Sequence, residues 1–266
     1  MKKNISKNME NQPSKHNEKI FSERTSLNPE SYKLEGLQIH GFNKLTLLDY
    51  PGHTGAVLFL GHCNFRCPFC QNSPLVLTPD KEPLVSLDEI FSFLKKRQGI
   101  LEGVCISGGE PTLSPQLPEL AALLKELGYL VKLDTNGSRP DVIKSLVDRH
   151  LVDYIAMDIK SSRERYPDVC GCSIPLSAIE ESVQFLLSGE TEYEFRTTVV
   201  RELHRAEDFI SISRWISGSR QYFLQSYKDS DGVMTPGFHS CTDEELHHYL
   251  SIVQQTIPSA KLRGVE

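Results

Sequence analysis

The sequence of 266 residues lacks several features that would place it in a special class of protein. It has no apolar run of about 18 residues, so we expect no membrane-spanning helix. The residues after Met1 are polar and do not form the apolar stretch of a secretory signal peptide, so we expect a cytoplasmic protein. The 17 glycines and 15 prolines follow no period, which excludes a collagen-like chain. The 39% of apolar and 24% of charged residues are typical of a globular protein.

Basic residues are scarce beyond the N-terminal segment. The chain has 29 Lys and Arg against 35 Asp and Glu, a net charge of −6. Residues 1–33 hold seven of the basic and four of the acidic side chains, so the rest of the chain carries −9. Such a body lacks a phosphate-neutralising surface, so we expect neither nucleic acid nor a membrane as a partner. Residues 1–35 are rich in Lys, Asn, Ser and Glu, which predicts a disordered extension before one folded domain at 36–266.

Strand-like and helix-like segments alternate along the rest of the chain. Apolar and β-branched runs predict strands at 56–60, 104–106, 129–134, 152–159, 192–199 and 221–226. Amphipathic patterns predict helices at 86–97, 114–127, 140–149, 175–188 and 205–217, with one more after Thr242. Ser86 and Thr242 each begin a capping-box pattern, and Ser114 precedes a proline suited to a first helical turn.

Alternation of this kind implies parallel strands joined by right-handed helical crossovers. About six strand–helix units are present, fewer than the eight of a closed barrel. We therefore predict an α/β fold, an open partial (β/α)6 barrel, with its functional site at the carboxyl ends of the strands.

Three cysteines lie directly after the first predicted strand. Cys63, Cys67 and Cys70 have the spacing C-x3-C-x2-C, and an odd total of seven cysteines disfavours a disulfide framework. A structural zinc site normally has a fourth ligand at a matching spacing, which is missing here. Three thiolates on a cubane [4Fe–4S] cluster would leave one iron open for chemistry. A zinc knuckle or three unrelated thiols is the alternative interpretation.

The triplet, with Phe69 before its last cysteine, resembles that of the radical S-adenosylmethionine (SAM) superfamily. Residues 107–111, Ser-Gly-Gly-Glu-Pro, resemble the Gly-Gly-Glu-Pro motif of that superfamily. The segments 134–137, Asp-Thr-Asn-Gly, and 157–160, Met-Asp-Ile-Lys, resemble motifs of the glycyl-radical activating enzymes. The segment 41–52, which contains Leu-Leu-Asp-Tyr-Pro-Gly, is similar to the activating proteins of anaerobic ribonucleoside-triphosphate reductase. The resemblance covers roughly residues 37–226.

This resemblance implies an oxidoreductase of the radical SAM type, with the fold predicted above. It would cleave SAM reductively to a 5′-deoxyadenosyl radical and so generate a glycyl radical on anaerobic ribonucleoside-triphosphate reductase. The implied cofactors are a [4Fe–4S] cluster and SAM, with a monovalent cation as a further candidate, and the implied electron donor is a flavodoxin- or ferredoxin-type protein. Two alternatives remain: a radical SAM enzyme acting on another glycyl radical protein, peptide or small molecule, and an electron-carrier or metal-binding module.

The resemblance also assigns roles to individual residues. Cys63, Cys67 and Cys70 would bind the cluster and form the catalytic centre. The remaining candidates would contact SAM or lie close to it. Phe69 would contact the adenine through its backbone, and Gly108, Gly109 and Glu110 would bind the amino group. Asp134 and Asp158 would lie beside a cation that Thr135 helps to hold, Lys160 would contact a carboxylate or the ribose, and Asn72 and Arg196 would lie nearby. Without the resemblance, Asp134 would be interpreted as a turn residue and Arg196 as a surface charge. Gln225 and Tyr227, at the end of the last predicted strand, are candidates to face the substrate.

Two positions depart from the family pattern. His62 stands before the first cysteine, where the family usually has glycine, and it would be costly if that position needs a positive φ. Gln71 follows the last cysteine, where the family often has histidine. The remaining cysteines carry no assigned role. Cys105 is expected to be a buried apolar residue, and Cys170 with Cys172 supplies too few thiols for a second cluster.

Overall fold

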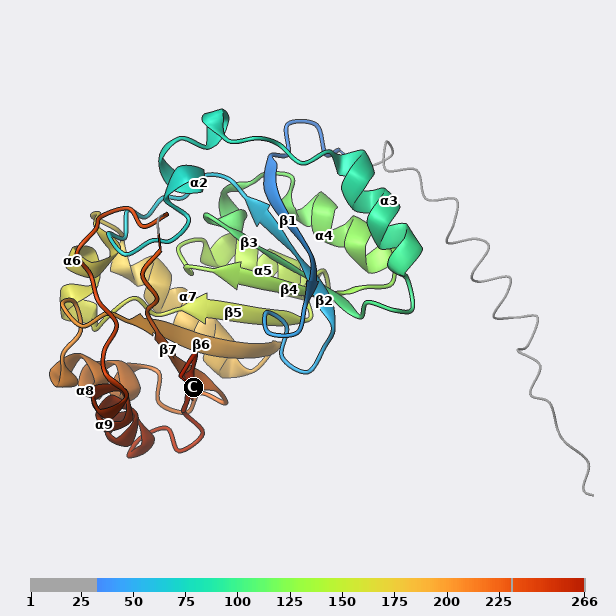
Figure 1. Cartoon of the computed structure of the whole chain (residues 1–266). Coiled ribbons are helices and arrows are strands. Elements are labelled where there is room, and N and C mark those ends of the chain that lie inside the picture. Colours follow the sequence, from blue (N-terminus) through green and yellow to red (C-terminus); the bar gives the residue numbers. More distant parts are fainter. Residues whose placement is uncertain (1–32, 231, 266) are drawn as a thin grey trace, which may run out of the picture.

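The computed structural model describes residues 33–230 and 232–265 (Figure 1). The predicted extension at 1–35 therefore lies almost wholly outside the described residues. Its end is described, and there Leu34 is buried in the hydrophobic core with 5% of its surface exposed. The packed part of the chain thus begins before the predicted boundary.

One eight-stranded sheet runs through the described residues in the order of the sequence. Its strands are β1 (Ile39–Thr46), β2 (Gly55–Leu60), β3 (Gly103–Gly108), β4 (Leu130–Thr135), β5 (Tyr154–Asp158), β6 (Glu192–Val199), β7 (Tyr222–Ser226) and β8 (Lys261–Arg263). β1 pairs antiparallel with β2, and every later pair is parallel. The edge strands β1 and β8 do not pair with each other in the described part, so the sheet stays open. The predicted open partial barrel is confirmed, with the six predicted strands as β2 to β7 and two unpredicted edge strands.

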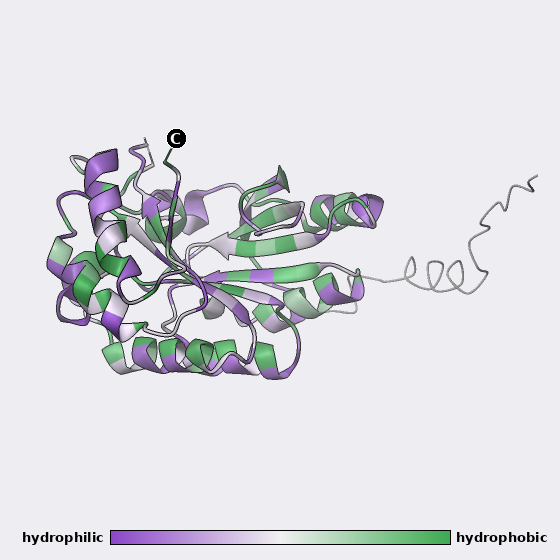
Figure 2. Ribbon diagram, turned by 90° about the horizontal axis from the view of Figure 1, so that it is seen from below, coloured by the Kyte–Doolittle hydropathy of each residue, from purple (hydrophilic) through white to green (hydrophobic). Residues whose placement is uncertain are grey.

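Helices connect the parallel strands and cover the outer face of the sheet (Figure 1). The longer ones are α3 (Leu87–Arg97), α4 (Leu117–Glu126), α5 (Pro140–Asp148), α7 (Leu176–Ser188), α8 (Ala206–Trp215) and α9 (Asp243–Gln254). Shorter elements are α2 (Ser73–Leu77), α6 (Tyr166–Cys170), η2 (Pro79–Lys81), η3 (Pro111–Leu113) and η4 (Arg163–Arg165). Figure 2 shows hydrophobic and hydrophilic residues alternating along the helices, as their amphipathic sequence patterns require. Within the described ranges, no helix has the length and apolar character needed to span a bilayer.

The helix starts agree only in part with the capping signals. The capping box of Thr242 is formed, because its hydroxyl accepts from the Glu245 N–H at 3.2 Å. Ser86 is the N-cap of α3 but its side chain makes no capping hydrogen bond, and Glu89 forms an ion pair with Lys44 at 2.9 Å instead. The helix expected after Ser114 begins at residue 117, because Ser114 ends the turn η3.

The two faces of each central strand have different surroundings. On β4, Val131 and Leu133 belong to the hydrophobic core, while Lys132 and Asp134 alternate with them and point into the barrel. On β6, Phe195 belongs to the core, and Arg196 lies on the opposite face. The barrel interior is therefore charged, and the candidate site lies at the carboxyl ends of its strands.

Candidate active site

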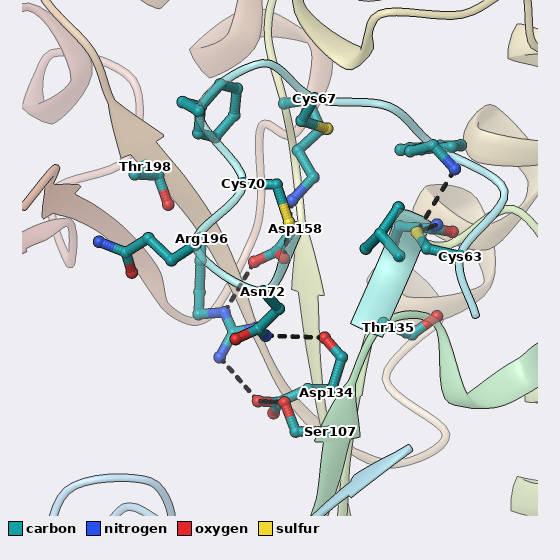
Figure 3. Close-up of a pocket in the computed structure, with 18 of the residues that line it drawn as sticks. Cys63, Cys67, Cys70, Asn72, Ser107, Asp134, Thr135, Asp158, Arg196 and Thr198 are labelled. Atoms are coloured by element: carbon teal, nitrogen blue, oxygen red, sulfur yellow. Dashed lines mark hydrogen bonds and ion pairs between the residues drawn. The ribbon is translucent and has the colours of Figure 1, made fainter. Parts of the chain in front are cut away.

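A single cavity at the carboxyl ends of the strands gathers most of the predicted site residues (Figure 3). Of the twelve candidates, all but Glu110 line it: Cys63, Phe69, Cys67, Cys70, Asn72, Gly108, Gly109, Asp134, Asp158, Lys160 and Arg196. These residues come from β3 to β6 and from the loops that follow β2, β3 and β5. The predicted site residues are thus brought together at the strand ends, where they were expected.

The loop after β2 carries the three cysteines and is held by hydrogen bonds to its own backbone and to neighbouring segments. The Cys70 N–H donates to the Cys67 carbonyl at 3.0 Å. The Arg66 guanidinium donates through one nitrogen to the carbonyls of Cys63 at 2.6 Å and Phe65 at 2.7 Å. These bonds wrap the loop so that all three thiol groups face the cavity.

His62 adopts a left-handed backbone conformation with φ of 64°. The conditional expectation about this position is therefore met, since glycine adopts such a φ at lower cost. The His62 N–H donates to the Leu75 carbonyl at 2.8 Å, and its carbonyl accepts from the Glu110 N–H at 2.7 Å. Its imidazole lies 3.1 Å from the side-chain oxygen of Gln38. The strained residue is thus fixed on both sides, just before the first cysteine.

The three thiols that line the cavity are a donor set that an iron–sulfur cluster can use. Burial raises the pKa of Cys63 to about 11 and that of Cys67 to about 12, so a bound cation would be needed to hold them as thiolates. No group of three or more His, Cys, Asp or Glu in the described part of the chain is arranged around one metal ion. A cubane takes one cysteine at each of several irons, so its ligands need not converge on one point.

Two consecutive glycines allow β2 and β3 to approach each other closely at their ends. A Cβ atom on Gly108, whose φ is 117°, would lie 2.3 Å from the Leu60 carbonyl oxygen. On Gly109 it would lie 2.0 Å from the His62 carbonyl oxygen. The close approach that the glycines permit is therefore one between two backbones, in addition to any contact with a ligand in the cavity. The Asn72 side chain donates to the Gly108 carbonyl at 2.9 Å and joins the cysteine loop to this turn.

Glu110 is placed differently from the expectation. Its side chain is buried, with 1% of the residue exposed, and it does not line the cavity. It accepts hydrogen bonds from the Thr112 hydroxyl at 2.5 Å and N–H at 3.1 Å, the Thr135 hydroxyl at 2.8 Å and the Asn136 N–H at 2.6 Å. In this arrangement Glu110 joins the turn after β3 to the end of β4 and the turn that follows it, and its contact with the SAM amino group stays a prediction.

Arg196 lies between two carboxylates (Figure 3). Its guanidinium is 3.3 Å from Asp134 and 2.9 Å from Asp158, and only 13% of its side chain is exposed, which excludes a surface role. Lys132 also pairs with Asp134, and Lys160 pairs with Asp158 at 3.0 Å. Although burial opposes it, these cations hold the pKa of both carboxyl groups below the usual range. The positive charge that the structure places between the two carboxylates is therefore a guanidinium, and the monovalent cation stays a prediction.

Several lining residues were not predicted. Asn136 donates to the Asn64 side chain at 2.9 Å and approaches the Cys63 sulfur at 3.9 Å. Thr198 lines the cavity two residues after Arg196, so the period of the strand could have identified it. Gln225 lines the cavity as expected, whereas Tyr227 is buried elsewhere with 1% exposure.

Comparisons with known proteins agree with this geometry. Residues 57–206 match the family model of the Radical SAM superfamily. The chain is 31% identical over 198 residues to a protein of Methanocaldococcus jannaschii named "Putative glycyl-radical enzyme activating enzyme", covering 73% of this chain and 81% of the relative. It is 30% identical over 137 residues to a 7-carboxy-7-deazaguanine synthase of Neisseria meningitidis, covering 51% and 55%. Among solved structures, Streptococcus suis SuiB bound to the precursor peptide SuiA has a similar fold. That structure gives a TM-score of 0.62 at 13% identity, covering 79% of this chain and 48% of SuiB.

Proposed function

The chain belongs to the radical SAM superfamily, and on that premise we propose that it is a glycyl-radical activating enzyme whose target is anaerobic ribonucleoside-triphosphate reductase. One observation carries the enzyme class in this proposal: a cysteine triplet and the charged ends of neighbouring parallel strands line a single cavity. A metal-binding or electron-carrier module would have no use for the charged wall opposite the cysteines. That wall favours an enzyme.

The residues of the cavity divide into two sets with different tasks. Cys63, Cys67 and Cys70 would hold the cluster, and the residues from Gly108 to Arg196 would hold SAM. When bound, these two groups supply a 5′-deoxyadenosyl radical that takes a hydrogen atom from the substrate. Lys160 and Arg196 offer positive charge for the carboxylate of SAM, since charge-assisted hydrogen bonds are the strong ones. The Phe69 backbone, beside the last cysteine, is suited to the adenine.

Glu110 supports both sets without entering the cavity. Its backbone N–H binds His62 beside the cysteine loop, and its carboxylate binds Thr135 and Asn136 beside the SAM wall. The two sets are thereby held at a fixed separation. Such preorganisation is what a reaction between two bound groups requires.

A protein substrate is favoured by the open sheet and by the relatives. Because β1 and β8 leave the described barrel unclosed, the cavity can be approached by a loop of another protein. The similarity to an activating enzyme of M. jannaschii and the peptide bound in SuiB support this class of substrate. The similarity to a 7-carboxy-7-deazaguanine synthase favours a second candidate, a radical SAM enzyme that acts on a small molecule.

The reductase target depends on the segment 41–52 and not on the cavity. Residues 41–46 of this segment belong to β1, and the rest forms the turn that leads to the amino end of β2, where Thr46 pairs with Gly55. The cavity lies at the other end of β2, beyond Leu60. The target is therefore proposed from the resemblance of that segment alone, and it needs a direct test.

The test is anaerobic incubation of the reconstituted protein with SAM, a reductant and candidate glycyl radical proteins. We expect a glycyl doublet in the electron paramagnetic resonance spectrum of the reductase, and deuterium from its glycine in 5′-deoxyadenosine. A doublet only on another glycyl radical protein would change the target and keep the activase class. Transfer of deuterium from a small molecule, with none from the glycine, would favour the second candidate.

A further inference from the structure

Two cysteines outside the triplet lie side by side against the cysteine loop. Cys170 is the last residue of α6, and Gly171, with a φ of 68°, ends that helix and turns the chain back. The sulfur atoms of Cys170 and Cys172 are 3.8 Å apart as a result. Neither residue lines the cavity, so this pair has no part in the site described above. We call residues 170–172 the dithiol turn.

The dithiol turn touches the segment between the first two cysteines of the triplet. The Arg66 N–H donates to the Cys170 carbonyl at 2.9 Å. The Cys172 thiol donates to the Asn64 carbonyl at 3.5 Å. A Cβ atom on Gly171 would lie 2.1 Å from the Arg66 carbonyl oxygen, so the two backbones are in direct contact. A change in the shape of the turn therefore alters its contacts with residues 64–66.

We propose that Cys170 and Cys172 form a reversible disulfide, and that this disulfide couples the oxidation state of low-molecular-weight thiols to the cysteine loop. The two sulfurs already lie on the same side of the turn. A disulfide bond is about 2.05 Å long, so they must close by less than the width of one atom. Cys241, in contrast, has no partner sulfur among the hydrogen-bond contacts of the described residues.

The chemistry is ordinary thiol–disulfide exchange with a small disulfide such as oxidised glutathione. The half-exposed Cys172 attacks as the thiolate, forms a mixed disulfide and releases one glutathione thiol. Cys170 then attacks the sulfur of Cys172 and releases the second glutathione. Both cysteines lose a proton, the pair loses two electrons, and the small disulfide is reduced to two thiols. Burial raises the pKa of Cys170 to about 11, so little of it is thiolate at neutral pH, and it is the 3.8 Å between the two sulfurs that favours the second, intramolecular step.

Oxidation would remove contacts as well as form a bond. A disulfide has no S–H group, so two hydrogen bonds are lost. They are the one from the Cys172 thiol to the Asn64 carbonyl and the one from the Cys170 thiol to the Pro167 carbonyl, at 3.6 Å. Because Gly171 is pressed against Arg66, the closing turn must displace the loop there. Where the loop holds a cluster, as the proposed function requires, we expect the oxidised form to release iron more readily.

The disulfide itself can be tested without the proposed activity. Trypsin should release residues 166–196 as one peptide, in which Cys170 and Cys172 are the only cysteines. The full reconstituted chain is equilibrated anaerobically in glutathione buffers of rising oxidised fraction, quenched in acid, alkylated at neutral pH and measured by mass spectrometry. We expect a peptide lighter by two hydrogen atoms that dithiothreitol restores. The matched controls are C172S, in which it must be absent, and C241S, in which it must persist.

Two outcomes would overturn the disulfide. One is a peptide that stays fully alkylated even in oxidised glutathione alone. The other is a lasting glutathione adduct on Cys172 with no ring closure. C172S keeps a hydroxyl donor for the Asn64 carbonyl and replaces a half-exposed residue, so it is expected to fold.

The coupling to the loop has its own readout. Iron release to a chelator is followed by absorbance in the oxidised and the reduced protein, with no SAM or partner present. We expect release about tenfold faster from the oxidised form, the low end of the effect of losing an outer-shell contact. C172S should release iron at one rate in both buffers. Equal rates in oxidised and reduced wild type would overturn the coupling, whatever the substrate of the enzyme proves to be.

Discussion

The inner and the outer face of the same sheet differ in what their side chains do. On β4 and β5 the outward residues Leu133, Ile155 and Met157 are buried against helices and belong to the hydrophobic core. The inward residues on these strands include Asp134 and Asp158, whose carboxylates form ion pairs with the Arg196 guanidinium in the cavity. The outer face therefore gains stability from apolar burial, while the inner face holds charges out of water at a cost that only their partners offset.

The difference teaches that stability and chemistry are assigned to alternate residues of one strand. Because side chains alternate between faces, a change at one position should affect one property and spare the other. The predictions that follow test this separation, beginning with the largest expected effect.

Replacing Cys63, Cys67 or Cys70 by alanine should abolish the cluster altogether, because two thiolates cannot hold it. The fold should remain, since these residues line the cavity and do not join strands or helices. Iron and sulfide content and visible absorbance after anaerobic reconstitution measure the effect. Cys172→Ala is the control that should keep a full complement of iron in reducing buffer. Iron retained in all three triplet variants would contradict the ligand assignment.

Arg196→Ala should remove about 3–5 kcal/mol of unfolding free energy, because it leaves Asp134 and Asp158 with one cationic partner each. Urea unfolding with circular dichroism measures it. Arg196→Lys, which keeps the charge, should lose less. A loss no larger than that of a surface substitution would show that the inner charges are solvated.

The same variant gives a pH dependence. The folded pKa values of Asp134 and Asp158 are lowered, so they stabilise the wild type above the unfolded pKa, near 4, and this stability is lost as the pH falls. The difference between wild type and Arg196→Ala should therefore be full at neutral pH and shrink below about pH 4. A difference that stays constant down to pH 3 would contradict an electrostatic cause.

Leu133→Ala tests the outer face of the strand that carries Asp134. Leu133 is fully buried, so the void that the substitution leaves in the hydrophobic core should cost about 2–4 kcal/mol of unfolding free energy. Its side chain points away from the cavity, and SAM affinity by equilibrium binding should not change under conditions where the variant is folded. Weakened SAM binding in the folded variant would show that the two faces are not independent.

Glu110→Gln separates support from ligand contact. The four donors around the carboxylate would face an amide whose NH₂ group cannot accept, so we expect a loss of about 1–3 kcal/mol of unfolding free energy. SAM affinity should fall less than in Asp134→Asn, which alters the cavity wall. A large loss of SAM affinity with unchanged stability would restore the direct contact expected from the sequence.

His62→Gly should have the smallest effect, a gain of up to about 1 kcal/mol from relief of the left-handed backbone. His150, with a φ of 54° at the end of α5, offers a matched control far along the chain from the cysteines. His150→Gly should gain a similar amount in urea unfolding. A lower unfolding free energy in His62→Gly, with a gain in His150→Gly, would mean that the contact of the His62 imidazole with Gln38 outweighs the backbone strain.

The sequence predicted much of the fold because the signals are local. Six strands and the helices between them were identified from period and apolar runs, and they became β2 to β7. β1 and β8 were missed, since each becomes a strand by pairing with an edge of a sheet that sequence alone does not show. The helix expected from Ser114 began three residues later, because Ser114 ends the turn η3 with an extended backbone and so does not begin the helix.

The sequence by itself determined the cysteine loop and the strand ends, because residues close in the chain must stay close in space. Only the tertiary structure decided which groups face each other across strands. The register of β5 and β6 sets Arg196 opposite Asp158, and the turn after β4 supplies the donors that turn Glu110 inward. The dithiol turn meets the cysteine loop although about a hundred residues separate them in the chain. Such contacts depend on how whole elements pack, and no short segment of sequence contains that information.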